Sequence, residues 1–225
     1  MSGNARKVST IMSRLSFSYA AIAAAGALLF TGCSAATNAV LSSVPLPPIN
    51  NLLNLDGEIT AASVNGTRAA TSGSGTKERE FGDRTLPEVN RLRFVRFNQS
   101  LERSVTVAVP SGAALPATFS LSNVALTLAV RDNAPRNVSV TGNVGGPITF
   151  ARVGETNQYQ ATTRVAFSNL ELKDGNFGTI RDIITSGPSP NFVTGRIAFD
   201  TDTDQLPLGS VLTFTFVDGT ARVGA

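Results

Sequence analysis

Apolar and polar residues alternate along most of the chain beyond residue 86. The alternation places the apolar members on one face of each segment, which is typical of strands half buried in a sheet. The clearest segments lie at residues 105–109, 124–130, 138–140, 148–150, 165–167, 197–199 and 212–216. We therefore expect a sheet-rich domain over residues 86–225.

The alternation changes phase once. Phe119 and Leu121 occupy odd positions, whereas the apolar residues that follow, from Val124 to Val130, occupy even positions. Because side chains in a strand repeat every two residues, such a slip requires one inserted residue. The pattern predicts a turn or bulge at Ser122 and Asn123.

Short polar connections at residues 132–136, 142–147 and 154–158 separate successive strands, and loops this short join antiparallel neighbours. Residues 174–187 differ, because their apolar residues recur at helical spacing before Gly187 and Pro188. We predict an all-β fold, an antiparallel two-layer β-sandwich of about eight strands with one short helix. A β-barrel of similar strand number is the alternative.

The N-terminal region carries three basic residues and then an uncharged apolar stretch at 20–30, too short to cross a bilayer as a helix and typical of a signal peptide. Thr31, Gly32 and Cys33 follow. The pattern resembles the lipobox of bacterial lipoproteins, in which the cysteine thiol receives a diacylglycerol group and the chain is cut just before it. The resemblance implies that residues 1–32 are removed and that Cys33 anchors the protein in a membrane.

The alternative is a secreted protein cut by the ordinary signal peptidase, with Cys33 left as an unmodified thiol. Ser34 follows the cysteine, where proteobacterial lipoproteins retained at the inner membrane carry Asp. By that family rule, we expect a lipid-anchored protein of the cell envelope, at the outer membrane rather than the inner membrane.

Residues 33–85 are dominated by small and polar residues, with a Pro cluster at 45–48 and a Ser/Gly stretch at 71–76. This composition predicts a partly disordered spacer of about 50 residues, which as a flexible chain spans about 40 Å. Two pieces leave alternatives open. Residues 49–55 form either a helical turn or a docked segment, and residues 58–64 form either spacer or an edge strand.

Charge and residue usage exclude several function classes. Three of the nineteen basic residues and none of the sixteen acidic residues lie in 1–32, so the remainder has no net charge and nucleic acid is not expected as a partner. The chain has no histidine, which removes Ser-His-Asp and Cys-His catalysis and the usual zinc ligands. Trp is absent too, which disfavours sugar stacking. We expect neither an enzyme nor a cofactor other than the lipid on Cys33.

Asp200, Asp202 and Asp204 alternate as carboxylates do at the start of a calcium loop. Gln205 stands where an EF-hand loop has its turn glycine, and Val211 stands where the closing Glu belongs. The favoured interpretation is a solvated loop with local backbone hydrogen bonds, and calcium is the alternative.

Arg91, Arg93 and Arg96 gather near Phe94 and Phe97. Basic residues interleaved with aromatic ones are typical of nucleic-acid surfaces, but a neutral protein outside the cytoplasm argues against that use. We interpret the arginines as an outward strand face paired with carboxylates. The alternative is contact with an anionic envelope partner.

A helix between late strands, ahead of a Gly-x-Ile strand at 195–197, resembles the order of elements in the seven-stranded sandwich of LEA14-like and WHy domains, which also occurs in bacterial lipoproteins. The resemblance implies a sandwich fold. For function, we predict a non-enzymatic accessory or scaffolding subunit of a surface or outer-membrane assembly, which interacts with envelope proteins. The alternative is a module that binds an apolar small molecule or lipid in its interior.

Overall fold

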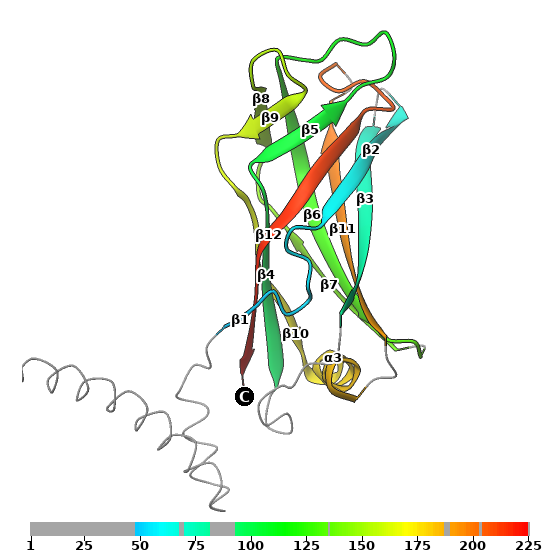
Figure 1. Cartoon of the computed structure of the whole chain (residues 1–225), viewed down its shortest axis with the longest axis vertical. Helices are drawn as coiled ribbons and strands as arrows, with labels where there is room; N and C mark the ends of the chain where they lie inside the picture. Colours follow the sequence, from blue (N-terminus) through cyan, green and yellow to red (C-terminus); the bar gives the residue numbers. More distant parts are fainter. Residues whose placement is uncertain are drawn as a thin grey trace, which may run out of the picture. The chain divides into compact units, whose positions relative to one another are not determined.

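The computed structural model describes residues 48–67, 70–81, 93–134, 136–186, 190–202 and 204–224. These residues form an antiparallel two-layer β-sandwich with one helix (Figure 1). They contain twelve strands, where about eight were expected. The elements are β1 (Ile49–Asn50), β2 (Ile59–Thr67), β3 (Ala70–Phe81), β4 (Phe94–Leu101), β5 (Ser104–Ala108), β6 (Thr118–Arg131), β7 (Asn137–Asn143), β8 (Ile148–Arg152), β9 (Gln158–Ala161), β10 (Val165–Lys173), α3 (Asp174–Ser186), β11 (Asn191–Thr201) and β12 (Val211–Gly224).

The two layers share strand β12. One layer runs in the order β2, β3, β11, β6 and β7, and the other runs in the order β10, β4, β12 and β1. The first half of β12 pairs with β2 on one side and with β5 on the other. Because β5 continues through β9 and β8 to β6, the hydrogen-bonded ladder closes on itself at the end opposite α3 (Figure 1). The fold is therefore a sandwich that is open at the helix end and closed at the other end.

A bulge allows β12 to serve both layers. Its second half pairs with β4, and the register shifts between Val217 and Thr220. Asp218 has a φ of 54° there, a conformation that favours residues such as Asp, Asn and Gly. A bulge of this kind bends a strand and increases its twist, so β12 passes from one layer to the other without a break.

The core is continuous between the layers and rich in phenylalanine. The rings of Phe119 and Phe150 stack with their centroids 5.0 Å apart, and the ring of Tyr159 tilts against Phe119 at the same distance. The buried face of α3 covers the open end of the sandwich with Phe177, Ile180, Ile183 and Ile184. The predicted helix is thus confirmed, although it ends at Ser186.

The predicted phase change is also confirmed. Asn123 has a φ of 50°, and the pairing of β6 with β11 shifts register between Ala198 and Asp200. The inserted residue turns the odd-numbered Leu121 and the even-numbered Val124 toward the same core, where both are buried. A left-handed conformation suits Asn, whose short polar side chain tolerates it.

The connections at 132–136 and 154–158 join antiparallel neighbours, as predicted. The prediction for 142–147 is wrong. Strands β7 and β8 lie one after the other along the same edge of β6, so residues 144–147 interrupt an edge rather than form a hairpin.

The predicted spacer is corrected over the described residues 48–67 and 70–81, which belong to the folded domain. Strand β3 lies between β2 and β11 inside a layer, and β2 pairs with β12. Leu52, Leu53 and Leu55 are buried in the core, so residues 49–55 dock on the domain. The domain therefore includes residue 49, and not only residues from 86. The predictions for residues 1–32 and 33–47 concern a part of the chain outside the described residues.

A search of the described residues for a helix long and apolar enough to cross a membrane finds none.

Candidate functional site

Strand β4 presents the sequence-predicted arginines that the structure describes. Its residues alternate between outward and buried positions, and Arg96 lies on the outward face while Arg93 is exposed just before the strand. The Arg93 backbone N–H donates to the carbonyl of Gly224 at 2.7 Å, which fixes its position beside β12. Arg91 lies outside the described residues.

Arg96 forms the ion pair that the sequence analysis expected of an outward arginine. Its guanidinium donates to the carboxylate of Glu171 on the neighbouring strand β10. The same guanidinium lies 5.6 Å from the centre of the Phe94 ring, within the range of a cation–π contact. Arg96 therefore contacts both the carboxylate of Glu171 and the aromatic ring of Phe94.

The sheet brings two further cations to this surface that sequence reasoning did not find. Arg222 of β12 lies directly opposite Arg96, and Lys173 of β10 lies directly opposite Phe94. Both are exposed. We call Arg96, Lys173 and Arg222 the basic face, and the exposed Arg93 adjoins it just before β4 begins. Its members come from three segments far apart in the sequence, and only the strand register could have joined them.

Among the described residues, the carboxylates near the basic face are few. Glu171 is paired with Arg96, and the structure gives Arg93, Lys173 and Arg222 no ion pair with a described residue. Like charges directly opposite one another in an antiparallel pair are destabilising; Glu171 offsets this repulsion at Arg96, whereas Arg222 has no described carboxylate beside it. The surface is therefore suited to an anionic partner.

The three aspartates proposed for calcium do not form a cluster of ligands. Asp202 Oδ1 accepts the backbone N–H of Asp204 at 2.9 Å, and the Asp202 carbonyl accepts two further backbone N–H groups. Asp200 Oδ2 accepts Nδ2 of Asn123 at 2.8 Å. No group of three or more metal-ligating residues comes together within the described part of the chain. The loop has the local backbone hydrogen bonds of the solvated interpretation.

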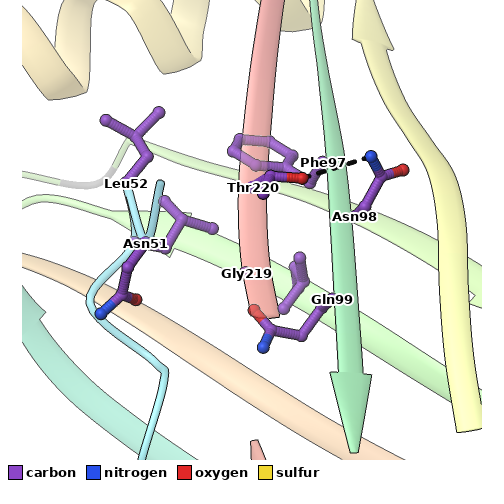
Figure 2. A pocket seen from close by; sticks show the side chains of 9 residues that line it. Asn51, Leu52, Phe97, Asn98, Gln99, Gly219 and Thr220 are labelled. Carbon is purple, nitrogen blue, oxygen red and sulfur yellow. Dashed lines mark hydrogen bonds between the residues drawn. The ribbon is translucent and has the colours of Figure 1, made fainter. Parts of the chain in front are cut away.

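A small pocket lies where the docked segment meets β4 and β12 (Figure 2). Leu52, Phe97 and Thr220 contribute to its wall, and Asn98 Nδ2 donates to Thr220 Oγ1 at 3.3 Å. Its volume of about 10 Å³ holds about one water molecule. The pocket is too small for a lipid chain or a sugar.

A carboxylate beside this pocket ties the docked segment to the bulge of β12. Asp56 accepts the backbone N–H of Gly219 at 2.8 Å and Nε2 of the buried Gln99 at 3.0 Å. Gln99 also donates to the carbonyl of Val217 at 2.9 Å. These groups satisfy one another, so we interpret the cluster as structural.

Among the described residues, Glu58 and Tyr159 have perturbed pKa values, each with a structural cause. A hydrogen bond from Lys77 lowers the pKa of Glu58, and the nearby charges of Lys77 and Arg79 act in the same direction against the opposing effect of burial. Burial raises the pKa of Tyr159. The Tyr159 hydroxyl donates to the carbonyl of Pro116 at 2.6 Å inside the core, so this tyrosine is not a surface platform for a sugar.

No protein-family model and no curated protein matches this chain. Solved structures of carbohydrate-binding modules match it with low similarity. TmCBM27, described as recognising mannan, shows 10% sequence identity and a TM-score of 0.30 over 81% of this chain and 98% of that chain. TmCBM61, solved in complex with β-1,4-galactotriose, shows 12% identity and a TM-score of 0.23 over 68% of this chain and 63% of that chain. TM-scores and sequence identities this low support no inference about a ligand of this protein.

Proposed function

We propose that this protein is a lipid-anchored protein of the cell envelope, tethered through Cys33, whose β-sandwich is a non-enzymatic accessory or scaffolding subunit of a surface or outer-membrane assembly. The observation that carries the proposal is the order of basic residues, short apolar stretch and Thr31-Gly32-Cys33. Two or three acyl chains of a lipoprotein make attachment effectively permanent, since each buried CH₂ is worth about 0.8 kcal/mol.

The makeup of the folded domain supports a binding role rather than a catalytic one. The sequence has no histidine, and the single cysteine precedes the domain. Glu58 and Glu171 are held in ion pairs, and Asp56 in a structural hydrogen-bond network. These three carboxylates therefore already have partners among the described residues, and their interactions hold the strands and the segment before β2 together.

The alternative role, an interior site for an apolar ligand, receives less support. Phe119, Phe150 and Tyr159 stack at the closed end of the sandwich, and Phe199 packs against Phe214 with ring centres 6.0 Å apart. Because close-packed side chains take the volume that a ligand would need, a partner is better accommodated on the surface.

The anchor is tested by the intact mass and thiol count of the mature protein. We expect a chain that begins at residue 33, has the added mass of a diacylglyceryl group and has no titratable thiol. Cys33→Ala should retain residues 1–32 or remain unlipidated. A mature chain with a free thiol at Cys33 would overturn the anchor.

The assembly role is tested by isolating the tagged protein from gently solubilised native envelopes. We expect a partner protein at fixed stoichiometry, and we expect Cys33→Ala to lose it because the variant is not held at the membrane. A protein recovered alone would argue against a scaffolding subunit.

A further inference from the structure

The basic face lies beside the point where the chain leaves the domain toward Cys33. Ile49 of β1 pairs with Ala221 of β12, the residue next to Arg222. Extending that register by one residue places Pro48 beside Arg222. In Figure 1, β1, the end of β12 and α3 lie at the same end of the sandwich. The point where the tether joins the domain, at Pro48, and the basic face therefore share one end of the domain.

The tether is also shorter than composition predicts. With residue 49 fixed on β12, the fifteen residues 34–48 separate it from Cys33. Whatever their conformation, these residues span at most about 55 Å, because an extended chain advances about 3.5 Å per residue. A spacer reaching to residue 85 would have spanned about three times as much. The end that bears Arg222 is thus the end from which the chain leads back to Cys33.

We propose that the basic face docks on anionic phospholipid headgroups of the membrane that holds the Cys33 lipid. The inference rests on the lipid anchor of the proposed function and assigns the face that the anchored domain turns toward the bilayer. Arg93, Lys173 and Arg222 supply charges without a carboxylate partner among the described residues, and Phe94, directly opposite Lys173 and Gly224, adds a partly exposed aromatic side chain.

An anionic surface relieves the unfavourable contact between the opposed arginines. Arg96 is neutralised by Glu171 on one side, whereas Arg222 faces Arg96 on the other side. Phosphate groups within hydrogen-bond distance of both guanidinium groups would offset their repulsion, and arginine binds phosphate in bidentate geometry. Docking by charge falls off within a Debye length of about 8 Å, so it requires the proximity that the short tether provides.

The test uses the mature lipidated protein in phospholipid vesicles. If Cys33 carries lipid, an introduced cysteine is the only thiol available for a fluorophore. One label is placed at the exposed Asn176 by Asn176→Cys, in the first turns of α3 near Lys173. Another is placed at the exposed Ser111 by Ser111→Cys, in the connection between β5 and β6, and β5 lies at the end of the sandwich opposite α3. A lipid-attached quencher then reports which end approaches the bilayer.

We expect the Asn176→Cys label to be quenched in vesicles that contain phosphatidylglycerol, with much less quenching in phosphatidylcholine vesicles. The Ser111→Cys label should stay unquenched in both. Each unit of charge removed near an anionic surface weakens binding about fivefold, so Arg222→Glu should lower the ratio of docked to undocked domain by about 25-fold. Arg196→Glu is the matched control, since Arg196 is exposed on β11 and the change in charge is the same.

Equal quenching in both kinds of vesicle, or equal effects of Arg222→Glu and Arg196→Glu, would overturn the docking proposal. Crosslinking of the Asn176→Cys site to an acidic envelope protein without lipid quenching would assign the face to a protein and overturn it as well. A second reactive thiol in the labelled protein, from an unmodified Cys33, would instead show that the anchor itself is wrong.

Discussion

Replacing Leu55 tests whether residues 49–58 belong to the folded domain. The Leu55 side chain is fully buried, and its segment is joined to β12 by backbone hydrogen bonds, including Gly57 N–H to the Phe216 carbonyl at 2.8 Å. Truncating a buried leucine to alanine costs about 2 to 5 kcal/mol, from lost apolar burial and the cavity left behind. In a domain of this size, each kcal/mol lowers Tm by about 2 to 4 °C. Leu55→Ala should therefore lower Tm by about 4 to 20 °C.

The measurement is urea and thermal unfolding followed by far-ultraviolet circular dichroism, because the chain contains no tryptophan. Ile59→Ala is the matched control, because that side chain is 55% exposed and lies only four residues away. We expect the control to cost about 1 kcal/mol or less. A spacer would tolerate both changes, so two variants whose free energies of unfolding agree within about 0.5 kcal/mol would refute a docked Leu55.

Three further outcomes follow from the structure. Gly75→Ala should cost about 1 to 3 kcal/mol in urea unfolding, because the new Cβ would meet the backbone carbonyl of Ala61 on the adjacent strand; wild-type stability would contradict this close approach. The hydrogen bond from Lys77 lowers the pKa of Glu58 in the folded state. The Lys77–Glu58 interaction therefore contributes its full stabilisation above the pKa of Glu58 in the unfolded chain, and this stabilisation is lost as the pH falls through the pKa of Glu58 in the folded protein. Thermal scans of Glu58→Gln should therefore show a smaller loss of Tm under acidic conditions than those of the wild type, and equal losses would argue against the ion pair. Millimolar calcium should shift Tm by less than about 1 °C, since Asp202 already accepts backbone donors, and a rise of several degrees would restore the calcium interpretation.

Hydrophobic periodicity predicted those strands whose own side chains fill the core. The segments around Val107, Leu126 and Phe214 alternate clearly and form β5, β6 and β12. The helix was predictable for the same reason, because its apolar residues repeat at a helical period and cover one end of the sheets. In each case, the apolar residues that produce the sequence pattern are the residues that are buried in the core.

Strand β3 could not be predicted from hydrophobic periodicity, because residues of the neighbouring strands occupy the space on its inward face. Its inward positions include Gly73 and Gly75, and the ring of Phe199 and the backbone at Ala61 occupy the space where side chains would stand. Glycine and serine have low β-propensity, so the segment has the composition of a linker. The neighbouring residues can pack this closely because Gly73 and Gly75 have no side chains, and the alternation of apolar and polar residues does not reveal such buried glycines.

The basic face shows the same limit for a site. The clustering of Arg93 and Arg96 was visible in the sequence, but their relation to Arg222 depends on the pairing of β4 with β12, which lies more than one hundred residues away in the chain. Hydrophobic periodicity shows which face of a strand a residue occupies, but it does not show which other strand pairs with that strand.

The position of β12 in the sandwich has a consequence for biogenesis. Its residues 211–224 pair with β2 and β5 in one half and with β4 and β1 in the other half, so neither layer is complete before they are made. A nascent chain that has emerged only as far as residue 210 lacks the strand that joins its layers. Contacts this distant in sequence form slowly, and the chain should stay unfolded until residue 224 has been synthesised. If the protein is exported through a membrane channel, as the proposed function requires, that delay would keep the polypeptide extended while it crosses.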